Sequence, residues 1–244
     1  MTTLLLGASG QLGRHLAARM PQTVTCARDG ADHVCDLSDP ASVADLLEKV
    51  RPGRIVNAAA WTAVDAAEDH PREAFRLNHD LPATLAEWCR RHDALLIHYS
   101  TDYVFSGNPG RPWREDDPVA PESVYGTTKL AGEQAVASSG CRALVLRTAW
   151  VYSALPGNFI SAILRRAAAG EGLKVVSDQI GSPTWAGTLV GATLRLLESF
   201  ADDIRRPTLL HVAGRGRMSW HELAVAAVQM AAERGIIPAE VAIE

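Results

Sequence analysis

The chain has 244 residues, of which 47% are hydrophobic and 21% charged, and its formal net charge is −4. A chain of this size can bury one sizeable core, with or without a smaller lobe, and its weakly acidic balance argues against nucleic-acid binding. No apolar run approaches the roughly 20 residues that cross a bilayer. Without a signal peptide or zinc-like spacing, the four cysteines predict a cytoplasmic protein with reduced thiols and no metal site: Cys26, Cys35, Cys89 and Cys141.

Segments typical of strands and helices alternate along the chain. The predicted strands are short and apolar and cover residues 3–6, 23–27, 55–57, 95–100, 143–147, 174–176 and 209–212. The predicted helices cover residues 11–20, 42–50, 71–92, 125–137, 159–169, 185–200 and 219–234. This alternation predicts an α/β fold, with a doubly wound parallel sheet of the Rossmann type. Ligands of such sheets bind at the carboxyl ends of the strands.

The first predicted strand leads into a glycine-rich turn. Gly7, Gly10 and Gly13 stand between this strand and the next helix, which begins with Gln11 and Leu12. Glycine permits a tight turn and the close approach of a pyrophosphate, while a helix N-terminus supplies amide donors. The spacing Gly-x-x-Gly-x-x-Gly differs from Gly-x-Gly-x-x-Gly, but its place between a strand and a helix predicts a dinucleotide site.

The segment after the second predicted strand bears on the choice of cofactor. Arg28 suits the 2′-phosphate of NADPH and favours it, whereas Asp29 keeps NADH open; both would also fit a solvated turn. Asp36 and Leu37 follow a third short segment and are candidates for adenine contacts. For Asp36, capping of the helix that follows Pro40 is nearly as good an interpretation.

Small and polar residues follow the predicted strand at 55–57. Ala60, Trp61 and Thr62 belong to a stretch that would let a dinucleotide lie close to the backbone, with the indole beside it. They are therefore predicted to line the cofactor site.

A hydroxyl-rich segment ends the predicted strand at 95–100. It runs from Tyr99 through Thr101, Asp102 and Tyr103. Thr101 is a candidate to hydrogen-bond a substrate carbonyl oxygen. Capping of the strand end is an alternative interpretation of each residue in this segment, above all of Asp102 and Tyr103.

Tyr125 and Lys129 are four residues apart in a predicted helix. The chain has only three lysines, the others being Lys49 and Lys174, against 21 arginines, so a lysine at this position suggests a specific need. One helical turn places the two side chains on the same face. A nearby ammonium lowers the pKa of a phenol from its usual value of about 10, which suits a proton donor. Taken alone, the spacing also arises by chance.

Several sequence blocks together resemble a known family. They are the glycine turn at 7–13, NAAAWTAVDAAE at 57–68, STDYVFSG at 100–107, Tyr125-x-x-x-Lys129, LRTAWVY at 146–152, VVSDQIGSPTWA at 175–186 and HVAGRGRMSWHELA at 211–224. These blocks resemble the extended short-chain dehydrogenases/reductases and, among them, the dTDP-4-dehydrorhamnose reductases. The likeness covers nearly the whole chain.

The resemblance implies reduction of the C4 keto group of dTDP-4-dehydro-6-deoxy-L-mannose to dTDP-L-rhamnose, with hydride from NADPH or NADH. By similarity, Tyr125 protonates the developing alkoxide, Lys129 lowers its pKa and holds the nicotinamide ribose, and Thr101 orients the carbonyl. The implied cofactor residues are Gly7, Gly10, Gln11, Leu12, Gly13, Arg28, Asp36, Leu37, Ala60, Trp61, Thr62, Tyr99, Tyr125 and Lys129. The implied substrate residues are Thr101, Asp102, Tyr103, Trp150 and Asn158, with Gln179 and Arg147 as weaker candidates. For Arg147, a structural ion pair is an equal alternative.

The resemblance also implies two parts. Residues 1–150 and about 173–205 would form the dinucleotide-binding domain, and residues from about 151 to 172 and from 206 to 244 a smaller substrate-binding lobe. Members of the family usually continue beyond the position of Glu244, so the lobe is expected to be truncated. Arg14 and His15 stand where some relatives carry a glutamate that joins a magnesium-linked dimer. We therefore expect no such metal contact, and a monomer or a weak homodimer.

Two other interpretations stay open. The chain could reduce another nucleotide-linked 4-keto-6-deoxysugar, because a few side chains of the lobe set the sugar specificity. It could also be a non-catalytic nucleotide-binding subunit, similar to the regulatory partner of methionine adenosyltransferase. The joint presence of Thr101, Tyr125 and Lys129 argues for chemistry but is compatible with a regulatory role.

Overall fold

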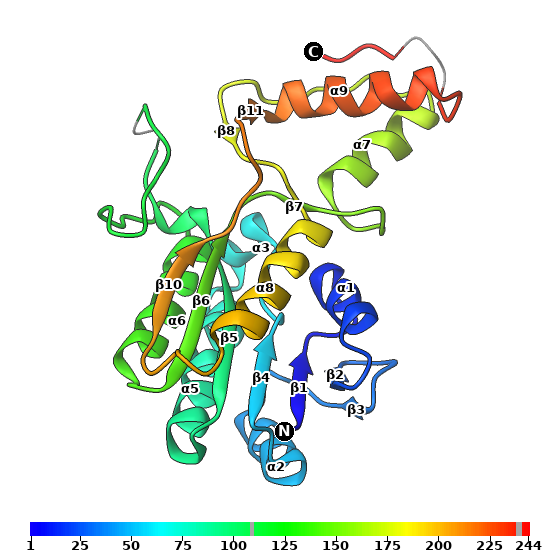
Figure 1. The fold of residues 1–244 in the computed structure, drawn as a ribbon. Helices are drawn as coiled ribbons and strands as arrows, with labels where there is room; N and C mark the ends of the chain where they lie inside the picture. The colour runs from blue at the N-terminus through cyan, green and yellow to red at the C-terminus, as the bar shows by residue number, and fades with distance from the viewer. Residues whose placement is uncertain (108–109, 238–240) are drawn as a thin grey trace. The chain divides into compact units, whose positions relative to one another are not determined.

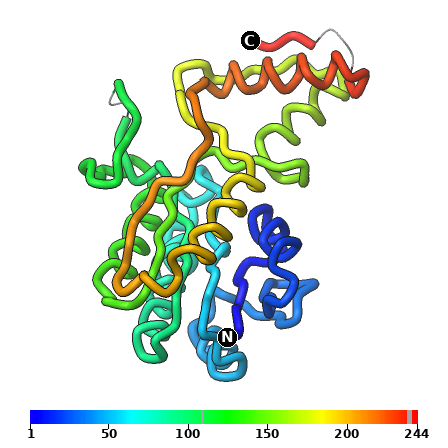
Figure 2. Tube along the Cα trace, in the orientation of Figure 1, coloured from blue at the N-terminus to red at the C-terminus, as the bar shows by residue number. Residues whose placement is uncertain are grey.

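The computed structural model describes residues 1–107, 110–237 and 241–244 (Figure 1). This part of the chain forms two compact units, residues 1–148 with 190–212, and residues 149–189 with 213–244. The chain passes from the first unit to the second after residue 148, returns within one long helix at residue 190, and passes to the second unit again after residue 212; its course can be followed in Figure 2. The boundaries differ from the predicted ones, since residues 149–150 and 173–189 belong to the second unit and residues 206–212 to the first. The roles of the two units stay predictions.

The first unit is built on a seven-stranded parallel sheet, which confirms the predicted fold class. The strand order is β10-β6-β5-β4-β1-β2-β3. The strands are β1 (Thr3–Leu6), β2 (Val24–Ala27), β3 (His33–Val34), β4 (Arg54–Asn57), β5 (Leu95–Thr101), β6 (Arg142–Thr148) and β10 (Thr208–His211). The order reverses between β1 and β4, and in sheets of this kind the ligand lies at the carboxyl ends beside that reversal.

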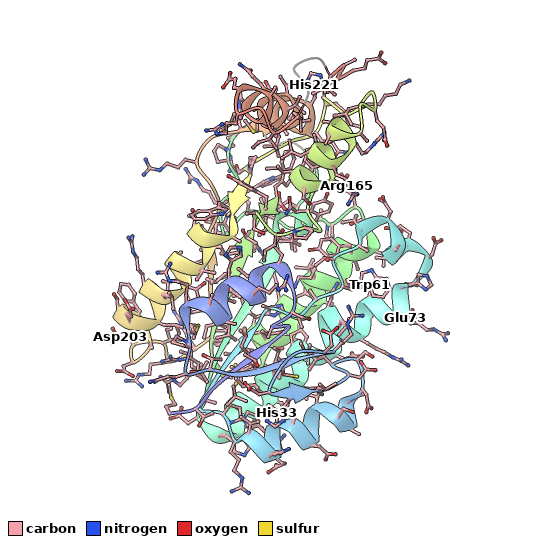
Figure 3. The ribbon with its side chains drawn as sticks, turned by 90° about the vertical axis from the view of Figure 1, so that its right-hand side faces the viewer. His33, Trp61, Glu73, Arg165, Asp203 and His221 are labelled. Carbon is pink, nitrogen blue, oxygen red and sulfur yellow. The ribbon has the colours of Figure 1, made fainter. Side chains whose placement is uncertain are left out.

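Helices cover both faces of this sheet (Figures 1 and 3). The helix α1 (Gln11–Arg19) and the part of α8 (Ala186–Phe200) that belongs to this unit lie on one face. The other face carries α2 (Pro40–Val50), α5 (Leu81–His92) and α6 (Val124–Ser138). Because side chains alternate along a strand, Leu4 and Leu6 of β1 face the core beneath the second group of helices. A sheet covered on both faces explains why its central strands are almost entirely buried and mostly apolar.

The helix predicted over residues 71–92 is divided in the structure. After α3 (Val64–Asp69) come α4 (Pro71–Phe75), a turn of π-helix η1 (Arg76–Asp80) and only then α5. Pro71 begins α4, since a proline at the first helical position loses no hydrogen bond. The π turn has one extra residue within the helical ladder, which a pattern of 3.6-residue periodicity does not reveal.

The second unit has short strands and two main helices. The strand β7 (Val151–Tyr152) pairs with β9 (Thr184–Trp185), and β8 (Ile180–Gly181) pairs with β11 (Met218–Ser219). The helices α7 (Phe159–Ala168) and α9 (Trp220–Glu233) pack together around Ile163, Ala167, Ala224 and Val228.

The strand predicted over residues 174–176 is wrong. Only Leu173 makes a bridge, to Ile243, and Val176 is 51% exposed. Hydrogen bonds of Val175 to Glu244 and of Val176 to His221 hold the segment without forming a strand, so its apolar residues gave a false strand signal.

Among the helices that the structure describes, none combines the length and the apolar character of a membrane span.

A buried ion pair joins β6 to α6. Arg147 Nη2 lies 2.6 Å from Glu133 Oε2, and both side chains are 6% exposed. The guanidinium carbon also lies 4.9 Å from the ring centre of Phe105. This pair confirms the structural alternative for Arg147.

Replacing one partner of this pair should destabilise the fold. We expect Arg147→Met to lower the free energy of unfolding by about 3–5 kcal/mol, because Glu133 would stay buried without a counter-charge. The matched control is Arg166→Met, whose pair with Glu171 has side chains 49% and 53% exposed and should contribute less than about 1 kcal/mol. Urea unfolding measures both, and equal losses would contradict the assignment.

Candidate active site

The glycine turn after β1 is tightly packed. Gly7 has a φ of +75°, and a Cβ at this position would lie 2.7 Å from the backbone nitrogen of Ala59. A Cβ at Gly13 would lie 2.0 Å from the carbonyl oxygen of Gly7. Both positions therefore require glycine, which brings the turn against the segment that follows β4.

The start of α1 fits a pyrophosphate. Gly10 is the N-cap residue and has no side chain to occupy the first amides, and the first turn contains no acidic residue. Gly10 is exposed, and Gln11 and Leu12, the first residues of the helix, are half-buried. The first turn of α1 therefore supplies backbone amides and the positive end of the helix dipole, which suit an anion.

Two charged residues lie beyond β2. Arg28 and Asp29 are both exposed. Hydrogen bonds from Ser38 lower the pKa of Asp36, and the charge of Arg28 adds to this effect, so Arg28 lies close to Asp36. Leu37 is buried in the core. The capping alternative for Asp36 is wrong, because Asp39 caps α2 by accepting from two of its backbone amides.

The segment after β4 is held by a buried asparagine that the sequence patterns did not single out. Asn78 lies in the π turn η1, is 0% exposed, and its Oδ1 accepts from the backbone nitrogen of Trp61 at 2.9 Å. Its Nδ2 donates to the carbonyl oxygen of Trp61 and to Thr128 Oγ1 of α6. Trp61, labelled in Figure 3, is half-buried, as is Ala60, while Thr62 is exposed. An asparagine within an amphipathic helix was the only sequence signal of this contact.

Tyr125 lies in the first turn of α6, close enough to Thr101 at the end of β5 for that side chain to lower the pKa of the phenol. Its ring meets that of Tyr103 edge-on, with 5.4 Å between the centroids. Burial raises the pKa of Tyr125 to about 12, against the lowering effect of Thr101. The direction is opposite to the predicted one, because burial dominates and the nearby Asp102 raises the pKa further.

Lys129 is anchored on β5. Its Nζ donates to the carbonyl oxygen of Tyr99 at 2.7 Å and lies 3.5 Å from His98 Nε2, and the residue is 2% exposed. Burial lowers the pKa of Lys129 to about 8, and the charge of Glu133 opposes this shift. The amine is therefore buried against the carboxyl end of β5 and does not lie on a solvated helix face.

Tyr99 contributes to the site through its backbone. Its phenol hydrogen-bonds Thr193 Oγ1 of α8 at 2.8 Å, and the residue is 8% exposed. Burial raises the pKa of this phenol. The predicted cofactor contact of its side chain stays a prediction.

The end of β5 is a compact polar turn. Thr101 Oγ1 donates to Asp102 Oδ1 and accepts from the backbone nitrogen of Tyr103, each at 3.2 Å, so Thr101 caps the short helix η2 (Asp102–Val104). Burial raises the pKa of Asp102 to about 6. A proton-donating threonine, a phenol and a carboxyl of raised pKa thus lie together at the carboxyl end of one strand, a combination found at catalytic sites.

Three predicted substrate residues belong to the second unit. Trp150 has a φ of +45°, and its indole stacks on Trp220 with 3.5 Å between the ring centroids. Asn158 caps α7, and its amide also donates to the carbonyl oxygens of Ser153 and Leu155. Gln179 is exposed. The substrate contacts of all three stay predictions.

The chain is similar to known proteins over nearly its whole length. A family model described as "RmlD substrate binding domain" matches residues 1–242. The dTDP-4-dehydrorhamnose reductase of Shigella flexneri is 40% identical over 239 residues, which are 97% of this chain and 80% of that protein. A Streptomyces antibioticus protein named "Probable dTDP-4,6-dihydroxy-2-methyloxan-3-one 4-ketoreductase" is 42% identical over 229 residues, 92% of this chain and 75% of that one.

A solved structure gives the same result. The crystal structure of dTDP-4-dehydrorhamnose reductase from Bacillus anthracis in complex with NADP has a TM-score of 0.86 and 28% sequence identity. The match covers 100% of this chain and 84% of that chain. These similarities confirm the resemblance drawn from the sequence blocks.

The raised pKa of Asp102 predicts how stability depends on pH. A carboxyl whose pKa is raised in the folded state stabilises the fold while protonated, and this stability is lost as pH rises through about 6. We therefore expect Asp102→Asn to raise the Tm at pH 8 and to change it little at pH 4. The control is Asp69→Asn at the exposed end of α3, for which both pH values should give the same change. Equal effects of Asp102→Asn at both pH values would contradict the burial of this carboxyl.

Proposed function

Because the chain belongs to the RmlD substrate binding domain family, we propose that it reduces the C4 keto group of dTDP-4-dehydro-6-deoxy-L-mannose to give dTDP-L-rhamnose. The reductant is NADPH, with NADH as the second choice, and the relative from Bacillus anthracis was crystallised with NADP. The observation that carries the proposal is the placement of Tyr125 and Lys129 one helical turn apart in α6, with the buried amine of Lys129 bound to the carbonyl oxygen of Tyr99 on β5.

The glycine turn and its surroundings are suited to the cofactor. Gly7 and Gly13 permit a close backbone approach, and the amides at the start of α1 suit a pyrophosphate. Arg28, exposed beyond β2, would pair with a 2′-phosphate, and Asp36 and Leu37 would lie near the adenine. Bound NADPH would supply the hydride that reduces the C4 carbonyl.

Tyr125 would supply the proton. A pKa of about 12 keeps the phenol protonated at neutral pH, so that it can donate to the oxygen of C4 as negative charge develops there. The hydroxyl of Thr101, which donates to Asp102 Oδ1 at the same strand end, would orient that oxygen. Loss of the phenolic proton leaves a phenolate, which a positive charge on Lys129 would stabilise.

Lys129 would also hold the nicotinamide ribose. Its pKa of about 8 means that most of the amine is charged at pH 7 and that this charge is lost as pH rises above 8. Asp102, Tyr103, Trp150 and Asn158 are the proposed contacts of the sugar nucleotide. A cytoplasmic location and a monomer or weak homodimer are also part of the proposal.

A sibling ketoreductase is the second candidate. The 42% identity to the Streptomyces antibioticus protein favours a related dTDP-sugar as an alternative substrate. Comparing kcat/KM for the two keto-sugars would separate these candidates. The reductase names of the relatives favour catalysis over a non-catalytic regulatory subunit.

Removal of the Tyr125 hydroxyl tests the proposal. We expect Tyr125→Phe to lower kcat about 10²–10⁴-fold while leaving NADPH affinity nearly unchanged, because only the proton donor is lost. NADPH oxidation is followed with dTDP-4-dehydro-L-rhamnose formed in place by the preceding enzymes. The matched control is Tyr152→Phe, at a half-buried tyrosine of the second unit with no proposed role. Full turnover by the Tyr125 variant would exclude this residue as the acid.

Arg28 should set the choice of cofactor. We expect Arg28→Ala to raise the KM for NADPH about tenfold and to leave the KM for NADH unchanged, because only NADPH carries the 2′-phosphate. Arg19, at the end of α1, gives the control Arg19→Ala, which should alter neither constant. An equal change for both cofactors would show that Arg28 does not read the 2′-phosphate.

A further inference from the structure

A buried pair of polar residues lies beneath Lys129 and has no part in the proposed reaction. Asn57 ends β4 and His98 lies on β5, and the two are direct partners in the register of these strands. They are 1% and 0% exposed, and Asn57 Nδ2 lies 3.1 Å from His98 Nδ1. The sheet itself therefore fixes this contact.

A second hydrogen bond determines which way the amide of Asn57 faces. The backbone N–H of Ala59 donates to Asn57 Oδ1 at 3.2 Å. Because a backbone N–H can only donate, its partner must be the amide oxygen, which turns Nδ2 toward His98. Nδ2 has only hydrogens to offer, so His98 Nδ1 must be the acceptor. In a neutral imidazole the proton then resides on Nε2.

The protonated nitrogen of His98 faces the amine of Lys129. Nε2 lies 3.5 Å from Nζ, while Nζ donates to the carbonyl oxygen of Tyr99 at 2.7 Å. Burial and the charge of Lys129 hold the pKa of His98 well below its usual value of 6.5, so the ring is neutral. A neutral amine has a lone pair that accepts from Nε2–H, whereas an ammonium has only donors.

We propose that Asn57 and His98 act as positioning residues that present an N–H, instead of a lone pair, to Lys129 and thereby favour its neutral amine. The contact between His98 and Lys129 is compatible with a neutral lysine and opposes a charged one. The register of β4 and β5 holds both residues in place, and the N–H of Ala59 orients the amide of Asn57.

The other groups around Lys129 shift its pKa in both directions. Burial favours the neutral amine and is the main reason that the pKa of Lys129 falls to about 8. Glu133, one turn further along α6, favours the charged form, but its carboxylate is shared with Arg147 of β6. Tyr125, on the same helix, is a neutral phenol in the pH range where Lys129 titrates. The Asn57–His98 pair therefore reinforces burial against the partly neutralised charge of Glu133.

The catalytic consequence rests on the proposed function. If the ammonium of Lys129 holds the ribose and stabilises the phenolate, activity declines as pH rises through the pKa of Lys129. The pair would then set the upper limit of the active pH range, and would leave Lys129 able to release and regain a proton near neutral pH.

The tautomer of His98 is the first test and needs neither substrate nor cofactor. In protein labelled with ¹⁵N histidine, long-range ¹H–¹⁵N correlation distinguishes the two neutral tautomers for each of the eight histidines. His98→Gln identifies the signal by its loss. We expect the Nε2–H tautomer, unchanged from pH 6 to pH 9. The Nδ1–H tautomer, or a charged ring, would overturn the proposal.

The titration of Lys129 is the second test. With three lysines in the chain, ¹³C labelling of the lysine side chains gives three signals, and Lys129→Arg identifies the one that matters. Asn57→Leu removes the donor to His98 without changing the net charge, so Nε2 becomes free to accept from the ammonium. We expect the pKa of Lys129 to rise by about one unit in this variant.

A second buried asparagine provides the matched control. Asn78 binds the backbone of Trp61 and the hydroxyl of Thr128, and has no bond to His98. We therefore expect Asn78→Leu to leave the pKa of Lys129 and the tautomer of His98 unchanged. An equal shift in both variants, or no shift in Asn57→Leu, would overturn the proposal. If Asn57→Leu does not fold, the tautomer of His98 in the wild-type protein still tests the proposal. A protein that shows the expected tautomer and titration but no ketoreductase activity would refute the proposed function alone.

Discussion

The site is organised around the buried amine of Lys129. An amine that is 2% exposed must have partners, and it finds them on β5, in the carbonyl oxygen of Tyr99 and the imidazole of His98. This requirement ties α6 to the carboxyl end of the central sheet. It therefore also fixes Tyr125, one turn earlier in α6, against Thr101. The strand end and the helix start are thereby held together.

Burial also changes how the tyrosine should be understood. The spacing Tyr-x-x-x-Lys predicts a phenol of lowered pKa, whereas the phenol of Tyr125 has a pKa raised to about 12. A raised value is consistent with a proton donor, because the phenol keeps its proton until the carbonyl oxygen becomes basic. Lys129, with a pKa of about 8, is the more easily titrated member of the pair. The pH response of the site should accordingly follow the lysine.

Local patterns predicted most of the fold and much of the site. The parallel sheet, the glycine turn and the shared helix of Tyr125 and Lys129 all follow from periodicity or from fixed spacing, which depend on neighbouring residues alone. The partners of Lys129 could not be predicted in this way. Asn57 and His98 meet only because β4 and β5 pair in one register, and Asn78 reaches Trp61 only through a π turn. The false strand at 174–176 arose where apolar residues were taken as buried.

The most direct test of the account follows the hydride. The protein is incubated with dTDP-4-dehydro-L-rhamnose and NADPH that carries deuterium on the transferable position of its nicotinamide, and the sugar product is examined by NMR and mass spectrometry. The account predicts dTDP-L-rhamnose with one deuterium, located at C4. Oxidation of NADPH without deuterium at C4, or no oxidation by a folded protein that binds NADPH, would contradict it.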